Sequence, residues 1–182
     1  MIEPGRIESR RAYTGRVINL DVDLVRFPDG STGELEMVRH PGASAIVPFL
    51  SDPAGADPQV LLIKQYRYAA DGFLYEIPAG RLDADESPEE CARRELLEET
   101  GCTTERLTLL TSMFTTPGFT DERIHLFLAS GLTRGTARRE ADEFIEVEVL
   151  PLSIALRMVE RGEITDAKTA LGLLFAAGFL GS

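Results

Sequence analysis

Residues 80 to 102, GRLDADESPEECARRELLEETGC, hold the side chains that could most clearly do chemistry. They include eight acidic residues and three arginines. Glu95, Glu98 and Glu99 are close enough in sequence to share one helix face, where like charges repel unless a cation lies between them. Oxygen ligands grouped in this way suit Mg2+ or Mn2+, which work with carboxylates and substrate phosphates. The alternative is a solvated helix surface with ion pairs such as Arg94 with Glu98.

The same stretch carries its own signals for a helix. Ser87 is a typical N-cap, and Glu90 follows it at the spacing of a capping box. Pro88 suits the first helical position, where the missing N–H costs nothing. Gly101 favours a left-handed stop at the other end. The pattern therefore predicts a helix from Pro88 to about Thr100.

The spacing of a known signature is found at Gly80, Glu86 and the run RELLEETG, which begins at Arg94. The stretch resembles the signature box of the Nudix hydrolases, and every fixed position of the box is filled. Only the last position departs from the pattern, because Cys102 replaces a bulky aliphatic residue while remaining apolar. The resemblance implies an α/β fold, the Nudix α/β/α sandwich, in which a mixed β-sheet is flanked by helices. It also implies a hydrolase of nucleoside diphosphates linked to another group.

The resemblance implies roles for the charged residues of the box. About two or three Mg2+ ions, or Mn2+, would bind in each site. The implied metal ligands are Ala79 through its backbone carbonyl, Glu95, Glu98 and Glu99. Arg94 would hold Glu98 in place, and Glu86 would be either a further ligand through water or part of the loop scaffold. Arg94, Glu95 and Glu99 are therefore expected to serve catalysis.

Other segments narrow the substrate. Pro117 lies fifteen residues after Cys102, in PGFTDE, and resembles the ADP-ribose pyrophosphatase subgroup of the family. That likeness implies hydrolysis of ADP-ribose to AMP and ribose 5-phosphate. Pro117-Gly118 could instead be a plain turn, and Phe119 could contact the substrate or the core. A broader nucleoside diphosphate-sugar pyrophosphatase, a nucleoside triphosphate hydrolase and a non-catalytic ADP-ribose sensor remain alternatives.

Four residues outside the box are candidates for contact with the substrate or the water. Arg67 follows a predicted strand and could place a guanidinium fork on a phosphate, unless it is a surface arginine. Glu76 could contact substrate or metal, or be a strand-edge carboxylate. The resemblance to the subgroup implies that a glutamate in the loop 134 to 143 is the general base that activates water. Glu143 aligns best with that position, and Glu140 is the alternative.

The remaining chain must position these residues. Strands are expected within 7 to 40, with a turn at 28 to 31, and at 43 to 50, 59 to 66, 74 to 78, 107 to 114, 124 to 129 and 145 to 150. Two C-terminal helices follow, the first capped by Ser153 and the second by Thr165 or Asp166. We expect residues 1–42 to be a β-rich extension for dimerisation and substrate enclosure, and residues 43–182 to be the Nudix domain.

Composition limits the classes of function. The chain has 182 residues, 43% of them hydrophobic, and a net charge of -11, which argues against nucleic acid as a partner. Its two cysteines suggest neither a disulfide framework nor a zinc site. No apolar stretch approaches the roughly 18 to 20 residues of a membrane span, and the N-terminus lacks the apolar core of a signal peptide. We expect a cytoplasmic homodimer with a small-molecule substrate and no membrane partner.

Overall fold

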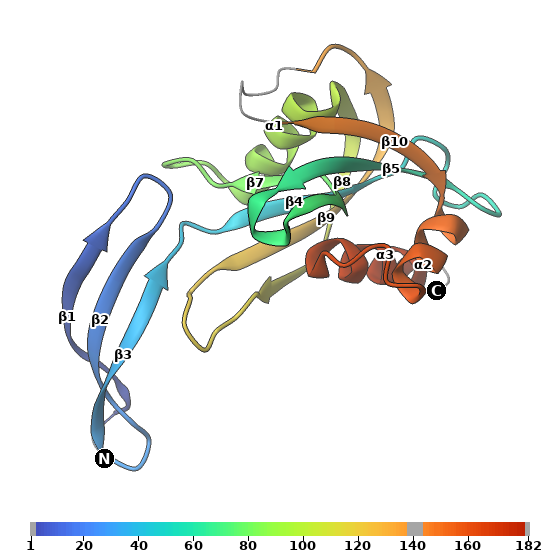
Figure 1. Cartoon of the computed structure of the whole chain (residues 1–182). Helices are drawn as coiled ribbons and strands as arrows, with labels where there is room; N and C mark the ends of the chain where they lie inside the picture. Colours follow the sequence, from blue (N-terminus) through green and yellow to red (C-terminus); the bar gives the residue numbers. More distant parts are fainter. Residues whose placement is uncertain (1–2, 138–143, 181–182) are drawn as a thin grey trace. The chain divides into compact units, whose positions relative to one another are not determined.

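The computed structural model describes residues 3–137 and 144–180. The chain divides into two compact units, one made of residues 1–42 and 113–124 and the other of residues 43–112 and 125–182 (Figure 1). In the described ranges, no helix is both long and apolar enough to cross a membrane.

The first unit contains an antiparallel sheet with strand order β1-β2-β3. Its strands are β1 (Gly5–Thr14), β2 (Asn19–Arg26) and β3 (Thr32–Arg39). The expected turn joins β2 to β3, with Gly30 at φ 88° and the Ser31 N–H donating to the Asp29 carboxylate at 2.9 Å. β1 pairs with β2 along most of its length. The extension is therefore a three-stranded sheet rather than a lone hairpin.

Arg39 is the polar centre of this unit. Its guanidinium donates to the buried carboxylates of Asp21 and Asp23, and to Asp121 at 3.1 Å. The backbone N–H of Val38 also donates to the carbonyl of Phe119 at 2.8 Å. These contacts hold the 115–122 loop on strand β3, although the two segments are far apart in sequence.

The second unit has two sheets, with strand orders β10-β5-β6 and β7-β4-β9-β8. The strands are β4 (Ala43–Pro48), β5 (Gln59–Arg67), β6 (Gly72–Glu76), β7 (Ala79–Arg81), β8 (Cys102–Phe114), β9 (Arg123–Arg134) and β10 (Ile145–Pro151). The last residues of β8 and the first residues of β9 belong to the first unit. A short 3-10 helix, η1 (Tyr68–Ala70), joins β5 to β6.

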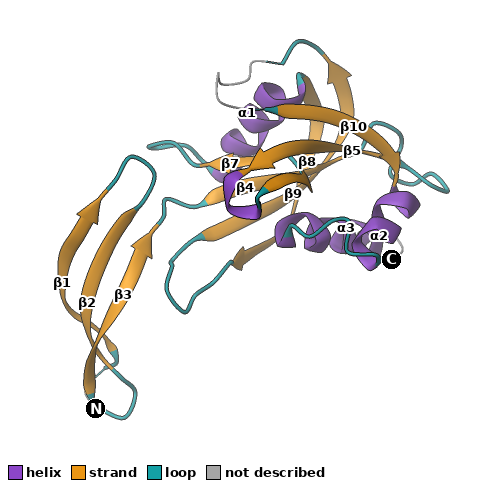
Figure 2. Ribbon diagram, in the orientation of Figure 1, coloured by secondary structure: helices purple, strands orange, loops and turns teal. Residues whose placement is uncertain are grey.

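In the described part of the chain, three helices cover these sheets. They are α1 (Pro88–Thr100), α2 (Leu152–Glu160) and α3 (Ala167–Leu180). Figure 2 shows α1 on one side of the strands and α2 with α3 on the other. A buried apolar cluster joins the inner face of α1 to the strands: Ile46, Leu61, Ile63, Ala92, Leu96, Cys102, Phe127, Ala129 and Ile145. The arrangement confirms the expected α/β class, with strands in two sheets between helices.

One of the two helix caps expected in the C-terminal segment is wrong. Asp166 does cap α3, because its carboxylate accepts from the Thr169 N–H at 3.0 Å. Ser153, however, lies inside α2, which begins at Leu152 and has no side-chain cap of its own. The N–H of Ser153 donates instead to Asp57 at 3.0 Å. A carboxylate distant in sequence therefore satisfies the helix N-terminus that a local serine was expected to satisfy.

Candidate active site

Helix α1 has the ends that its sequence predicts. The Ser87 hydroxyl accepts from the Glu90 N–H at 3.3 Å, and the Glu90 carboxylate accepts from the Ser87 N–H at 2.9 Å. Pro88 occupies the first turn, and Gly101 ends the helix at φ 74° with its N–H on Leu97 O at 2.8 Å. The capping box and the glycine stop fix where the helix starts and ends, and thus which carboxylates share its inner face.

Two of those carboxylates pack against the backbone that precedes the helix. Strand β7 pairs with β4, which places Ala79 and Gly80 beside α1. The Ala79 N–H donates to Glu99 at 3.0 Å. A side chain at Gly80 would collide with the Glu95 carboxylate, so only glycine allows this close approach. Both Glu95 and Glu99 are buried, which is unusual for glutamate.

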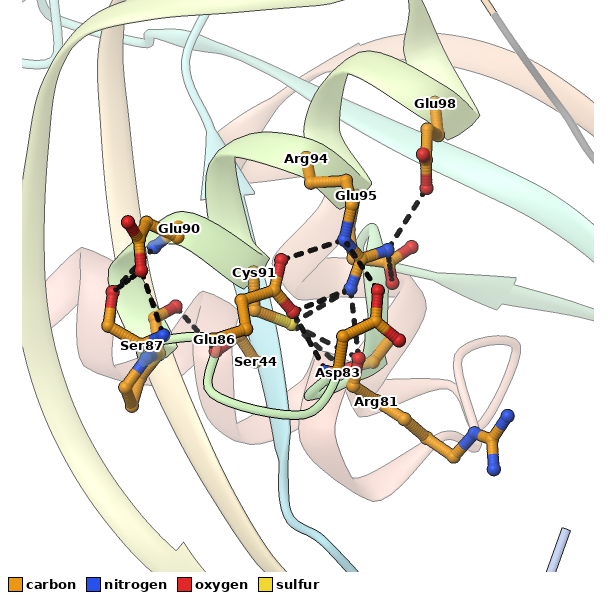
Figure 3. A network of polar contacts seen from close by, with 12 residues as sticks. Ser44, Arg81, Asp83, Glu86, Ser87, Glu90, Cys91, Arg94, Glu95 and Glu98 are labelled. Carbon is orange, nitrogen blue, oxygen red and sulfur yellow. Dashed lines mark hydrogen bonds and ion pairs between the residues drawn. The ribbon is translucent and has the colours of Figure 1, made fainter.

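Arg94 gathers the acidic side chains of the box (Figure 3). Its guanidinium forks onto Glu86 through Nε at 2.8 Å and Nη2 at 2.9 Å. Its Nη1 donates to Glu95 at 2.6 Å and to Glu98 at 3.0 Å. The hydrogen bonds with Arg94 lower the pKa of Glu86 to about 2, and those with Glu86 raise the pKa of Arg94. We call Arg94 with Glu86, Glu95 and Glu98 the Arg94 cluster.

The Arg94 cluster contains more negative than positive charge. One guanidinium faces three carboxylates, and Glu99 lies one position beyond Glu98 on the same helix. Among residues 3–137 and 144–180, no three His, Cys, Asp or Glu side chains form a preassembled metal-binding group. The donors are nevertheless the hard oxygens that Mg2+ and Mn2+ take, and Gly80 leaves room for Glu95 beside the backbone. The residues present therefore fit a divalent cation.

Arg67 and Glu76, predicted separately as substrate contacts, bind each other. Arg67 forks onto Glu76 through Nε at 2.7 Å and Nη2 at 2.9 Å. Lys168 donates to the same carboxylate and, at 3.0 Å, to Asp166. We call Glu76 with Arg67, Lys168 and Asp166 the Glu76 cluster. Lys168 was not among the predicted site residues, because nothing in the sequence links it to a residue 92 positions away.

The electrostatics of Glu76 are set by these cations. Burial alone would raise the pKa of Glu76, but hydrogen bonds from Arg67 and the charge of Lys168 outweigh it and lower the pKa overall. The pKa of Arg67 is raised, first by its hydrogen bonds to Glu76 and in smaller part by the charge of Glu99. The Glu99 carboxylate thus adds to the stabilisation of the charged form of Arg67.

The remaining predicted residues lie elsewhere or outside the described ranges. Pro117 and Phe119 are exposed and form a turn, in which the Phe119 N–H donates to Thr116 O at 3.2 Å. They belong to the first unit, with the N-terminal sheet. Glu143 and its alternative Glu140 lie outside the described residues.

Comparison with known proteins decides the family. A model of the NUDIX domain matches residues 40–170. The chain belongs to the NUDIX family. This confirms the family that the residues of the box predicted.

Several known proteins match this chain along nearly its whole length. An ADP-ribose pyrophosphatase of Bacillus subtilis (strain 168) is 40% identical over 96% of this chain and 92% of its own. A methanol dehydrogenase activator of Bacillus methanolicus is 37% identical over 96% of this chain and 93% of its own. A crystal structure of an ADP compounds hydrolase has a TM-score of 0.85, covering 100% of this chain and 96% of its own at 21% identity. That structure confirms the expected fold.

Proposed function

We propose that this NUDIX protein hydrolyses the diphosphate bond of ADP-ribose to AMP and ribose 5-phosphate. The observation that carries the proposal is the surplus of carboxylates on α1, two of them buried against the backbone at residues 79 and 80. Such a surplus suits a reaction in which cations and phosphates meet. The similarity to an ADP-ribose pyrophosphatase over 96% of the chain supports the substrate.

We assign the metal-binding role to the inner face of α1. The proposed ligands are the backbone carbonyl of Ala79 and the carboxylates of Glu95, Glu98 and Glu99, for about two or three Mg2+ or Mn2+ ions per site. When bound, such ions supply positive charge to the phosphoryl oxygens and lower the pKa of the attacking water. Arg94 orients Glu95 and Glu98 through its hydrogen bonds, and Glu86 orients Arg94. Glu86 thus belongs to the scaffold of the site.

Arg67 is the proposed contact for the diphosphate. A guanidinium has five N–H donors, and the two hydrogen bonds to Glu76 fix its plane. The remaining donors can then approach phosphate oxygens without a further loss of side-chain freedom. Glu76 contributes to substrate binding by holding Arg67 in this orientation, and Lys168 holds Glu76 from the other side.

Glu143 is the proposed general base, with Glu140 as the alternative. The proposal rests on the sequence and on the residues that flank the loop. Phe144, the next residue along, accepts a hydrogen bond at 3.3 Å from the N–H of Tyr66, which directly precedes Arg67. The residue that follows Glu143 is therefore hydrogen-bonded to the strand that carries the proposed phosphate contact.

The first unit is the proposed dimerisation and substrate-enclosing part. The loop with Pro117 and Phe119 is hydrogen-bonded to β3, so we propose that it acts together with residues 1–42. Enclosure of the adenine end by this unit in a cytoplasmic homodimer completes the proposal. Light scattering at several protein concentrations tests the dimer, and a monomer at all concentrations would contradict it.

A substrate panel tests the activity. The full chain is incubated with Mg2+ and, separately, with ADP-ribose, NADH, another ADP-sugar, GDP-mannose and a nucleoside triphosphate, and product release is measured. We expect AMP from ADP-ribose at the highest kcat/KM. Faster cleavage of another diphosphate sugar would replace ADP-ribose by that substrate. Binding of ADP-ribose without any turnover would instead indicate a sensor.

A further inference from the structure

Gln65 has a buried side-chain oxygen that nothing in the described chain satisfies. The residue is 6% exposed, and its Oε1 accepts no hydrogen bond from the residues that the structure describes. A buried acceptor left unpaired costs about 1–3 kcal/mol, so native proteins rarely keep one without a use. A hydrogen-bond donor from outside residues 3–137 and 144–180 would remove this cost.

The strand places this oxygen on the face that carries the proposed phosphate contact. Side chains alternate along β5, so Gln65 shares a face with Ile63 and Arg67. Ile63 belongs to the apolar cluster beneath α1, and Arg67 is held by Glu76. Along this face of β5, Gln65 thus lies between the apolar core and Arg67.

Its strand neighbours cannot supply the missing donor. The residues paired with Gln65 across the sheet are Leu74 on β6 and Ile145 on β10, both with apolar side chains. Ile63, two positions back on the same face, is apolar as well. Because these groups have no side-chain N–H or O–H, none of them can satisfy the oxygen, and a molecule that enters the site is a possible source of the donor.

We propose that Gln65 is a ligand-contacting residue of the site, whose Oε1 accepts a hydrogen bond from an O–H group. That group belongs either to a hydroxyl of the substrate or to a water molecule held beside it. The inference rests on the proposed function for the identity of the substrate, and it extends that function by one specific contact next to Arg67.

Gln65→Leu tests the contact, because it removes the acceptor at nearly constant volume. Gln59→Leu is the control on the same strand, since Gln59 begins β5 and is exposed. For Gln65→Leu we expect kcat/KM for ADP-ribose to fall about 10-fold, while the free energy of unfolding in urea stays equal or rises. For Gln59→Leu we expect kcat/KM to stay unchanged.

The kinetic split identifies the donor. A rise in KM indicates a substrate hydroxyl, and a fall in kcat at constant KM indicates a held water. Unchanged kcat and KM in Gln65→Leu, or an equal loss in Gln59→Leu, would overturn the proposal. If Gln65→Leu does not fold, Gln65→Met is measured in the same way.

A binding measurement separates this inference from the proposed function. Calorimetric titration of ADP-ribose in EDTA compares the wild type with Gln65→Leu and requires no turnover. Weaker binding by the variant supports the contact even if the wild type cleaves nothing, in which case only the proposed function fails. Equal binding together with equal kinetics refutes the contact while leaving wild-type hydrolysis intact.

Discussion

The Arg94 and Glu76 clusters use the same kinds of ion pair in opposite proportions. In the first, one arginine faces Glu86, Glu95 and Glu98. In the second, one buried glutamate lies between Arg67 and Lys168, and Asp166 balances the extra cation. The first cluster has a surplus of negative charge, whereas the second is neutral within itself. The difference teaches that the first is suited to recruit a cation, while the second is suited to hold Arg67 in place.

Glu99→Gln should have the largest effect, because it removes one carboxylate from the face with the charge surplus. We expect kcat for ADP-ribose to fall by about 100-fold or more, while calorimetric binding of ADP-ribose survives. Glu89→Gln is the control on the same helix, since the Glu89 side chain is 58% exposed and pairs only at the surface with Arg93. Turnover at the wild-type rate in Glu99→Gln would contradict a role of the α1 carboxylates in catalysis.

Arg94→Lys should lower activity, although every carboxylate on the inner face of α1 is kept. A lysine lacks the planar fork, so it cannot hold Glu86, Glu95 and Glu98 together. We expect a loss of about 10- to 100-fold in activity at low Mg2+, partly recovered as Mg2+ is raised. Arg93→Lys, which alters a neighbouring arginine bound to Glu89 and to Thr104 O, should change little. An unaltered Mg2+ dependence in Arg94→Lys would contradict the positioning role.

Glu76→Gln should act mainly on stability. It leaves two cations, Arg67 and Lys168, around a neutral group in a buried position, and breaking such a pair costs about 3 kcal/mol. Urea denaturation measures the loss. The comparison is Glu163→Gln, at a surface pair with Arg161 whose side chains are 50% and 68% exposed, where we expect less than about 1 kcal/mol. Equal losses would show that the buried cluster is no more important than a surface pair.

The stability of the wild type and that of Glu86→Gln should respond differently to acid, and we expect this effect to be smaller than the preceding ones. Because the folded-state pKa of Glu86 is lowered to about 2, its contribution to stability is present above the unfolded value near 4.5 and is lost as pH falls toward 2. Urea midpoints measured across this range should fall less steeply in Glu86→Gln. Identical pH dependence in the two proteins would mean that Arg94 does not stabilise the Glu86 carboxylate.

The local chemistry of α1 could be predicted from the sequence. Ser87, Glu90 and Gly101 satisfy groups within their own turns, so spacing alone identified the helix and its ends. The failure at Ser153 has the opposite cause, because Asp57 reaches the start of α2 from a distant loop. Caps made by neighbours in sequence are therefore readable in advance, and caps made by tertiary contacts are not.

The candidate site shows the same limit. The carboxylates of α1 were found because their spacing repeats with the helix. Lys168 was missed because its partner Glu76 belongs to a different element, and Gln65 was missed because an unpaired oxygen is a property of the folded surroundings. Arg67 was predicted to contact a phosphate, which stays a prediction, whereas its fork onto Glu76 became visible only in the structure.

The central claim is that the carboxylates of α1 bind the cation. Measuring the binding of Mn2+ to the full chain by electron paramagnetic resonance tests it most directly. At a temperature where both proteins are folded, we expect the wild type and Glu76→Gln to bind Mn2+ with similar affinity. We expect Glu99→Gln to bind Mn2+ much more weakly. Equal Mn2+ binding by Glu99→Gln and the wild type, or loss of binding only in Glu76→Gln, would contradict the assignment of the cation to α1.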